Sequence, residues 1–310
     1  VFEGSLRECQ QAPVASYLKH ANDPLHMGGI LQLPPGYGKT VMALYICFTL
    51  KTKTLVIVHK DFLLKQWKER IEQYIPKARV GLIKRDVMQT QNCDIVLGSL
   101  QTVLRRFPDT SFGLLIVDEC HHMGAQVFSQ ALHRMNFTYA LGLSATVNRA
   151  DGLSKVFKWF LGDVIFKAKR NAEEQAGLAV KLIKYRDTSP SYCKEHLMFN
   201  GKVNMSKMLN NICDYDARTA FLVQMTLAVL HDESDRNVLI LSDRRAHLED
   251  IEKELVRGGF PKEEVGFYVG GMKNEALKVS ETKQLLLGTY NMVSEGFDLP
   301  KLDTLVMASP

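Results

Sequence analysis

A short turn between a strand pattern and a helix pattern constrains this chain more than any other feature. The turn, Pro34-Pro35-Gly36-Tyr37-Gly38-Lys39-Thr40, follows an apolar strand pattern at residues 29–33 and precedes a nearly all-apolar run at residues 41–50. The amides of a glycine-rich turn and the partial positive charge of a helix N-terminus both favour a bound phosphate. The sequence therefore predicts a phosphate-binding loop in an α/β domain.

Two side chains of this loop have separate expected roles. Lys39 is expected to reach the β- and γ-phosphates of ATP, and the hydroxyl of Thr40 is expected to ligate Mg²⁺. Leu33 stands where the general pattern has its first glycine. A glycine-rich turn with a surface lysine is the alternative, but it does not account for the flanking strand and helix. The remaining residues of the predicted ATP-binding loop are Pro35, Gly36, Tyr37 and Gly38.

A pair of acidic residues follows another apolar strand pattern. Asp118-Glu119-Cys120-His121 comes directly after residues 114–117. Carboxylates at the carboxyl end of a central parallel strand face the ligand crevice. We expect Asp118 to hold Mg²⁺, directly or through water, and Glu119 to orient or deprotonate an attacking water. A solvated acidic loop is the alternative, and the independent phosphate loop argues against it.

Apolar strand patterns alternate with helix patterns along the whole chain. Continuously apolar strands separated by helices indicate mainly parallel sheets with helices on both faces. A polar, weakly periodic stretch at residues 168–211 divides the pattern, so we expect two α/β domains at residues 1–167 and 212–310. The strand patterns lie at residues 29–33, 54–58, 94–98, 114–117, 140–143, 238–241, 267–269, 285–287 and 305–307.

Bulk composition adds a few limits. A length of 310 residues suits two domains, and a net charge of +5 is compatible with a nucleic-acid partner. The six cysteines include no CxxC pair and the histidines complete no ligand set, so we expect no zinc site and reduced thiols in an intracellular protein. No apolar run is long enough to predict a membrane span.

The phosphate loop and the Asp-Glu-x-His sequence together resemble superfamily 2 helicases, and further motifs occur in that family's order. The resemblance implies RecA-like domains, with ATP and Mg²⁺ as cofactors. It also implies that Gln10, in Leu6-Arg7-Glu8-Cys9-Gln10, reads adenine through its amide. Ser144-Ala145-Thr146 resembles the motif that couples hydrolysis to the nucleic-acid site. Coupling roles are therefore implied for His121, Ser144 and Thr146.

Two strand-end segments resemble the family's nucleic-acid contact motifs. His59-Lys60 follows the strand pattern at residues 54–58, and Gly98-Ser99-Leu100-Gln101-Thr102 follows the one at residues 94–98. Hydroxyl and amide groups suit phosphate oxygens. Plain helix capping is an equal alternative for both segments. The implied contact residues are His59, Lys60, Ser99, Gln101 and Thr102, while Trp67 fits a helix-packing role better than base stacking.

The sequence after Thr146 resembles one branch of the superfamily. Arg149-Ala150-Asp151-Gly152 matches an R-x-D-G sequence of XPB-type and phage UvsW-type DNA helicases and their relatives in large DNA viruses. Val147 stands where the family usually has proline. The branch implies a coupling role for Arg149 and a DNA partner, preferred over RNA, with 3′→5′ movement; it is compatible with a larger transcription or repair complex.

The second half contains sequences similar to motifs IV and V of the family. Leu241-Ser242-Asp243-Arg244 resembles the start of motif IV. Gly288-Thr289-Tyr290 and Ser294-Glu295-Gly296-Phe297-Asp298-Leu299-Pro300 resemble motif V. The resemblance implies nucleic-acid contacts from Ser242, Arg244 and Thr289, and nucleotide contacts from Gly296 and Asp298.

The sequence stops at Pro310, before the Q-x-x-G-R-x-x-R motif with which family members continue. An arginine finger is worth about 10³- to 10⁵-fold in rate. We therefore expect this stretch of chain by itself to bind ATP but to hydrolyse it poorly, as part of a longer protein.

Three other functions remain compatible with some of these motifs. One is the duplex-DNA translocase motor of a restriction or remodelling enzyme, which moves without separating strands. Another is a nucleic-acid clamp that binds ATP and does no work. A small-molecule P-loop kinase is the weakest, because it does not explain Ser144-Ala145-Thr146 or the motif V sequence.

Overall fold

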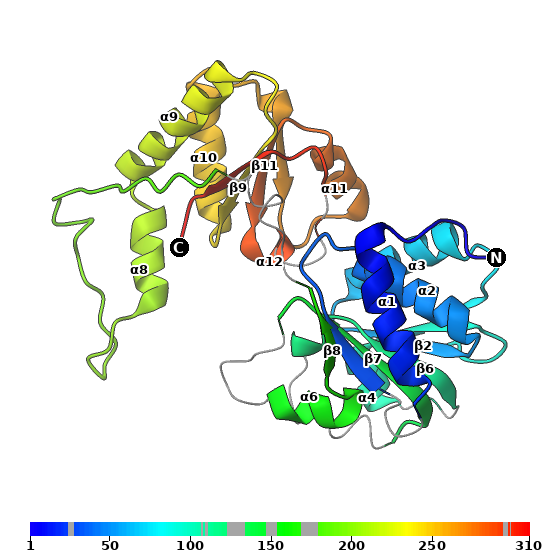
Figure 1. Ribbon diagram of the computed structural model, residues 1–310. Coiled ribbons are helices and arrows are strands. Elements are labelled where there is room, and N and C mark those ends of the chain that lie inside the picture. Colours follow the sequence, from blue (N-terminus) through cyan, green and yellow to red (C-terminus); the bar gives the residue numbers. More distant parts are fainter. Residues whose placement is uncertain are drawn as a thin grey trace. The chain divides into compact units, whose positions relative to one another are not determined.

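The chain forms two compact units, Val1–Ala179 and Val180–Pro310. The computed structural model describes residues 1–23, 28–106, 108, 111–122, 134–146, 154–168, 179–293, 297 and 299–310. Each unit has its own sheet (Figure 1). Each also has its own clusters of buried hydrophobic residues. The predicted α/β class with mainly parallel sheets is confirmed.

The first unit contains an eight-stranded sheet in the order β4-β3-β5-β2-β6-β7-β1-β8. Every neighbouring pair is parallel except β3 with β4. The sequence patterns did not predict β3, β4 or β8. The strands are β1 (Gly28–Gln32), β2 (Thr54–Val58), β3 (Val80–Lys84), β4 (Val87–Met88), β5 (Ile95–Ser99), β6 (Phe112–Val117), β7 (Phe137–Ser144) and β8 (Val164–Lys167).

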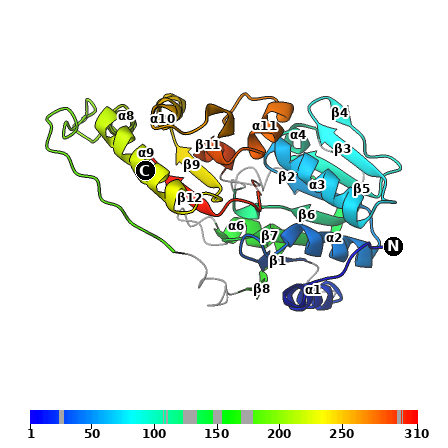
Figure 2. The ribbon, with the colours of Figure 1, turned by 90° about the horizontal axis from the view of Figure 1, so that it is seen from above.

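Helices cover both faces of this sheet (Figure 2). One face carries α1, α2 and α3, whose buried residues form a cluster with inward side chains of the strands. The other face carries α4 and α6, which contribute Val103 and Leu161 to a separate cluster. The helical segments are α1 (Glu8–Ala21), α2 (Lys39–Leu50), α3 (Asp61–Tyr74), α4 (Leu100–Arg105), the 3-10 turn η1 (Cys120–His122) and α6 (Ser154–Leu161).

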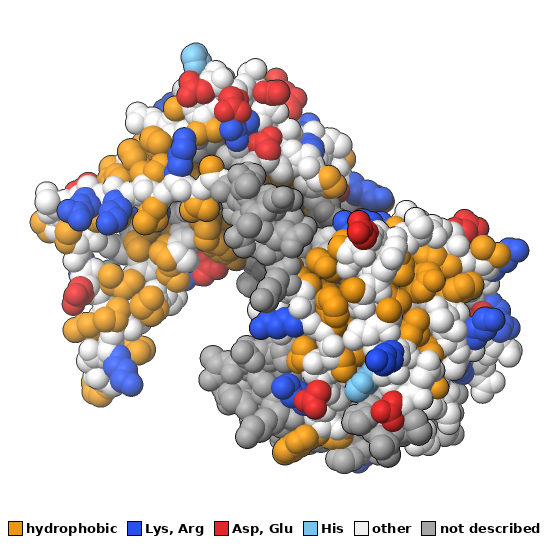
Figure 3. Space-filling view, in the orientation of Figure 1, with side chains coloured by type: hydrophobic (Ala, Val, Ile, Leu, Met, Phe, Trp, Pro, Cys, Tyr) orange, Lys and Arg blue, Asp and Glu red, His pale blue; other side chains and the backbone are white. Residues whose placement is uncertain are grey.

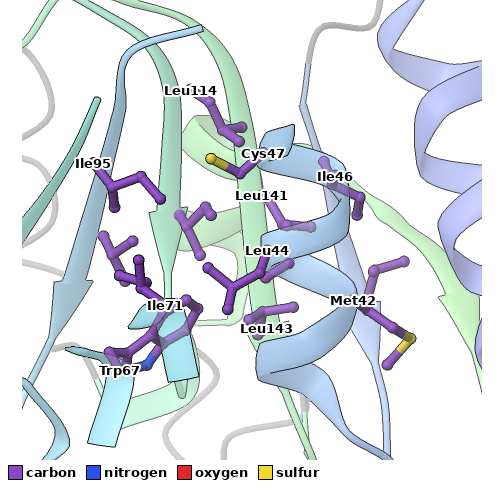
Figure 4. Packing of buried hydrophobic residues seen from close by; sticks show 14 of the residues in the cluster. Met42, Leu44, Ile46, Cys47, Trp67, Ile71, Ile95, Leu114, Leu141 and Leu143 are labelled. Carbon is purple, nitrogen blue, oxygen red and sulfur yellow. The ribbon is translucent and has the colours of Figure 1, made fainter. Parts of the chain in front are cut away.

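Helix α2 is apolar almost all round because its neighbours enclose it. Leu44 and Cys47 point toward Leu141 and Leu114 of the sheet, while Met42 lies on another side of the helix (Figure 4). Helix α3 is amphipathic, and its predicted apolar face is buried at Leu63, Leu64, Trp67 and Ile71. This packing fixes the starts of both helices at the sheet edge where β1 and β2 end.

The second unit contains a four-stranded, wholly parallel sheet in the order β10-β11-β9-β12. The predicted strand at residues 267–269 occurs slightly earlier, as β10. The elements are α8 (Met205–Cys213), α9 (Asp216–Asp232), β9 (Val238–Ser242), α10 (Arg245–Arg257), η2 (Lys262–Glu264), β10 (Val265–Tyr268), α11 (Asn274–Glu281), β11 (Leu285–Thr289), α12 (Tyr290–Val293) and β12 (Thr304–Met307).

The stretch at residues 168–211 contains more order than its weak periodicity indicates. Helix α8 begins inside it, and the side chain of Asn204 caps that helix by accepting a hydrogen bond from the amide of Lys207. An isolated antiparallel bridge joins Leu197 to Val203. Across the described residues, no helix is both long and apolar enough to cross a membrane.

Candidate functional site

The strand order of the first unit brings three motifs to one edge. β6, β7 and β1 are adjacent and parallel, so their carboxyl ends lie side by side. Lys39 follows β1, Glu119 follows β6, and Ser144 ends β7. The amide of Leu33 also donates to the carbonyl of Ser144 over 2.8 Å. Residues more than 100 positions apart in sequence therefore share one site.

The phosphate loop needs its glycines for different reasons. Gly36 and Gly38 both have left-handed backbones, with φ of 78° and 83°. A Cβ atom on Gly36 would meet nothing within 4 Å, whereas one on Gly38 would lie 2.2 Å from Nε2 of Gln10. Gly38 is therefore required for close approach as well as for backbone conformation.

Side chains at the start of helix α1 hydrogen-bond to the backbone of the phosphate loop. Nε2 of Gln10 donates to the carbonyl of Tyr37 over 2.9 Å, and Oε1 of Gln10 accepts from the amide of Arg7 over 2.9 Å. Nη2 of Arg7 donates to the carbonyl of Gly36 over 3.1 Å. Gln10 is buried against the loop, so adenine recognition stays a prediction and would require exchange of these amide contacts. Sequence reasoning missed Arg7, although it lies within the motif quoted for Gln10.

Lys39 and Glu119 form a direct ion pair. Nζ of Lys39 lies 2.5 Å from Oε1 of Glu119, and both side chains are largely shielded from solvent. Glu119 has a left-handed backbone with φ of 45°. A non-glycine residue in that region is strained, and such strain is concentrated at functional sites.

Asp118 is buried beneath the ion pair. Its Oδ2 accepts a hydrogen bond of 2.8 Å from Nε1 of Trp67, and its Oδ1 accepts one of 3.0 Å from the amide of Glu119. Burial raises the pKa of the Asp118 carboxyl, and the hydrogen bond from Trp67 partly offsets that rise. Trp67 packs as predicted, and it also positions this carboxylate, which the sequence did not indicate.

The donor set at this edge fits Mg²⁺. Carboxylate and hydroxyl oxygens are ligands that hard cations prefer. Thr40 occupies the first turn of α2 and is half-buried. Oε2 of Glu119 is buried and accepts no hydrogen bond within the described part of the chain, although Nδ1 of His121 approaches it to 3.4 Å. An unsatisfied carboxylate oxygen suits a water or a metal-bound water at this position.

A polar chain links Glu119 to the end of β7. Nδ1 of His121 lies 3.4 Å from Oε2 of Glu119 and 2.8 Å from Oγ of Ser144. The same hydroxyl contacts both the amide and the carbonyl of Thr146. His121, Ser144 and Thr146 are thus brought together, whereas Arg149 lies outside the described residues.

The two predicted contact segments of this unit lie farther along the same edge, after β2 and β5. His59 and Lys60 are half-buried, and Gln101 is exposed. Ser99 and Thr102 are buried and face each other, with their hydroxyl oxygens 2.9 Å apart. Oγ1 of Thr102 also accepts a hydrogen bond of 3.0 Å from the amide of Arg85. Both hydroxyls therefore bond within the protein, so a nucleic-acid contact from Ser99 or Thr102 stays a prediction and would require exchange of these bonds.

Two of the predicted nucleic-acid contact residues in the second unit, Ser242 and Thr289, differ in their burial. Ser242 is fully buried, and its Oγ lies 2.9 Å from Nδ1 of His247. A nucleic-acid contact from Ser242 stays a prediction and would require this buried hydroxyl to become accessible. Burial lowers the pKa of His247 to about 4. Thr289 is half-buried at the end of β11, beside Ser242 in register.

Arg244 is half-buried and bonds to helix α8. Its Nε donates to Oδ1 of Asn210 over 2.6 Å, and its Nη2 lies 3.2 Å from Oγ of Ser206. Gly296 and Asp298, the expected nucleotide contacts, lie outside the described residues.

Comparison with known proteins identifies relatives over the whole chain. A family model described as the res subunit of type III restriction enzymes matches residues 3–149. The chain is 32% identical over 318 residues to a protein of Acanthamoeba polyphaga mimivirus named as an ATP-dependent RNA helicase, a match that covers 100% of this chain and 59% of that protein.

Two further relatives extend this pattern. A protein of Invertebrate iridescent virus 6 named as a helicase is 27% identical, over 99% of this chain and 71% of that protein. The DNA 3′-5′ translocase XPB2 of Sulfurisphaera tokodaii is 30% identical over 190 residues, which cover 61% of this chain and 41% of that protein. The chain spans 59% of the length of the mimivirus relative, which is less than two thirds.

Proposed function

We propose that this chain is a superfamily 2 helicase and forms the ATP-dependent motor core of a helicase or translocase that acts on nucleic acid. The observation that carries this proposal is the polar chain Lys39–Glu119–His121–Ser144. It connects the predicted phosphate site to the segment that resembles the family's coupling motif, with contacts of 2.5, 3.4 and 2.8 Å.

The ion pair gives the first residue-level step. When Lys39 binds the phosphates of ATP, its ammonium leaves Oε1 of Glu119. The freed carboxylate can then accept a proton from a water aimed at the γ-phosphate, which is the role of a general base. Asp118 and Thr40 would hold Mg²⁺, which supplies charge stabilisation for the transferred phosphoryl group when it is bound.

The same step provides a route for coupling. Loss of the Lys39 contact changes the charge around Glu119, whose other oxygen faces His121. His121 in turn contacts Ser144, so a change at the phosphate site can shift the segment that includes Thr146. A two-state element that both sites bias is the physical requirement for such coupling.

We further propose that the partner is DNA and that movement is 3′→5′. The R-x-D-G sequence after Thr146 and the similarity to a DNA 3′-5′ translocase support this choice. The name of the mimivirus relative points instead to RNA, so both nucleic acids belong in the test. Phosphate contacts should dominate binding, which would then weaken steeply with salt.

The test is ATP turnover by the whole protein with no nucleic acid, with DNA and with RNA of the same length. The expected result is stimulation by DNA that exceeds stimulation by RNA. Turnover that neither nucleic acid changes would contradict the motor proposal and leave an ATP-binding clamp as the better description.

A second candidate is a motor that moves on duplex DNA without separating strands. The match to the restriction-enzyme family model over residues 3–149 favours it. Displacement of a third strand from a triplex, without release of a strand from a forked duplex, would select this candidate. Release of the forked strand would select the helicase.

A further inference from the structure

We propose that the hairpin at residues 196–204 is a base-stacking element, with Phe199 as the side chain that stacks against an unpaired nucleobase. The site is the exposed aromatic tip of a hairpin that the sequence patterns left without a role. This inference rests on the proposed function, because it adds a specific nucleic-acid contact to the motor.

Backbone hydrogen bonds define the hairpin. The amide of Met198 donates to the carbonyl of Lys202 over 2.7 Å, and the amide of Asn204 donates to the carbonyl of His196 over 2.7 Å. The amide of Gly201 closes the turn on the carbonyl of Met198 over 2.9 Å, with φ of 75° at Gly201. This turn places Phe199 at the tip.

The tip presents large apolar side chains to solvent. Phe199 is fully exposed, and Leu197, Met198, Val203 and Met205 are also exposed. Water-exposed apolar groups gathered on one short hairpin mark an interaction site more often than single scattered ones do. An aromatic ring beside flexible apolar side chains can stack on a base or enter between two bases.

Charge favours nucleic acid as the occupant. Residues 194–211 contain three lysines, Lys194, Lys202 and Lys207, against one acidic residue, Glu195. Apolar and basic side chains lie interspersed on the α8 side of this unit in the space-filling view (Figure 3). Aromatic stacking with flanking cations is the combination by which proteins hold single-stranded nucleic acid. An apolar protein partner would not require this excess of lysine.

Hydrogen bonds connect the hairpin through α8 to Arg244, a predicted nucleic-acid contact residue. Asn204 ends the hairpin and caps α8, and the amide of His196 donates to Sδ of Met208 on that helix over 3.3 Å. Helix α8 contacts Arg244 through Ser206 and Asn210. The hairpin and Arg244, which follows β9, are therefore joined through one short helix.

The test compares Phe199→Ala, Phe199→Tyr and the unchanged protein for binding to a single-stranded oligonucleotide that contains 2-aminopurine. Phe199→Ala should weaken binding about tenfold and remove the quenching of 2-aminopurine fluorescence, because each stacked base contributes to affinity. Phe199→Tyr should keep both the affinity and the quenching, because tyrosine retains an aromatic ring that can stack. Val279→Ala, at an exposed apolar residue on α11 of the same unit, is the matched control and should leave both unchanged.

Separate outcomes distinguish this inference from the proposed function. If the unchanged protein binds no nucleic acid, the motor proposal fails, and the stacking role fails with it. If the unchanged protein binds and is stimulated while Phe199→Ala behaves identically, only the stacking role is overturned. A change of sedimentation mass in Phe199→Ala, with unchanged oligonucleotide affinity, would also overturn it by assigning the hairpin to self-association.

Discussion

Nζ of Lys39 lies 2.5 Å from Oε1 of Glu119, so the phosphate-loop lysine and the acidic-pair glutamate neutralise each other within one unit. Both atoms have further expected partners: phosphate for the ammonium and an attacking water for the carboxylate. The pair therefore acts as a contact that nucleotide binding would exchange, and it determines what substitutions at either residue should do.

Glu119→Gln should separate ATP binding from hydrolysis. The glutamine amide keeps the size of the glutamate side chain and can still contact His121. It cannot, however, accept a proton from water. We expect turnover of the whole protein in the presence of nucleic acid to fall by about 10²- to 10⁴-fold, the usual contribution of a general base. Affinity for a fluorescent ATP analogue should stay the same or rise, because Lys39 is released from an ionic partner. Unchanged turnover would rule out the assigned role.

Trp67→Phe should move the acid limb of the ATPase profile to higher pH. Trp67 donates to Oδ2 of Asp118, which lowers a pKa that burial has raised. Without that donor the pKa of Asp118 rises further, so the carboxylate form that can bind Mg²⁺ is lost at a higher pH. The measurement is the pH dependence of turnover.

The same variant should lose stability with a defined pH dependence. Because burial raises the pKa of Asp118 in the folded protein above its ordinary value of 3.8, the folded protein binds this proton more tightly than the unfolded chain does. The raised pKa therefore lowers the free energy of unfolding at pH values above the pKa of Asp118 in the folded protein. This loss disappears as the pH falls toward the pKa of the same group in the unfolded chain. The unsatisfied carboxylate should add about 1–3 kcal/mol to that loss at neutral pH. Trp159→Phe, at the exposed second tryptophan of the chain, is the matched control and should change neither property.

Ser144→Ala should weaken coupling more than basal hydrolysis. The substitution removes the hydroxyl that His121 contacts at 2.8 Å but leaves the Lys39–Glu119 pair intact. We expect basal turnover close to normal, with most of the stimulation by nucleic acid lost. His121→Ala should have a similar effect, and the double variant should be no worse than either single one, because both remove the same link. Additive losses would show that the two residues act separately.

Gly38→Ala should be more damaging than Gly36→Ala. Both residues have left-handed backbones, so either alanine should cost roughly 1–2 kcal/mol. Only the new methyl group at position 38 would collide with the amide of Gln10. We expect Gly38→Ala to lose ATP-analogue binding and to lower the melting temperature further than Gly36→Ala. Equal effects would mean that Gln10 moves aside without cost.

The spacing of apolar residues predicted much of the fold, because the periodicities of helices and strands depend on residues that are neighbours in sequence. The apolar run after Thr40 forms the buried helix α2, and the apolar face of α3 is the predicted one. Short or two-residue strands such as β4, and the edge strand β8, lack such a signal, because their burial patterns are mixed. Helix α8 was missed for a similar reason, since it is short and begins inside a polar stretch.

Sequence pattern gives least information about the surroundings of single hydroxyl groups. Ser99, Thr102 and Ser242 all follow or end strands as expected, yet each is buried and bonded to a neighbouring side chain. A hydroxyl at a strand end can serve solvent or a cap equally well. Burial depends on how the following helix packs, and sequence spacing does not contain that information.

The sequence by itself determined the phosphate loop, the acidic pair and the order of the motifs, because each is a short run of residues whose chemistry is local. Only the tertiary structure decided that Lys39 pairs with Glu119, that Trp67 holds Asp118, and that His121 joins Ser144. Those contacts depend on β6, β7 and β1 lying next to one another. Strand order is set by packing between distant segments, and no run of neighbouring residues specifies it.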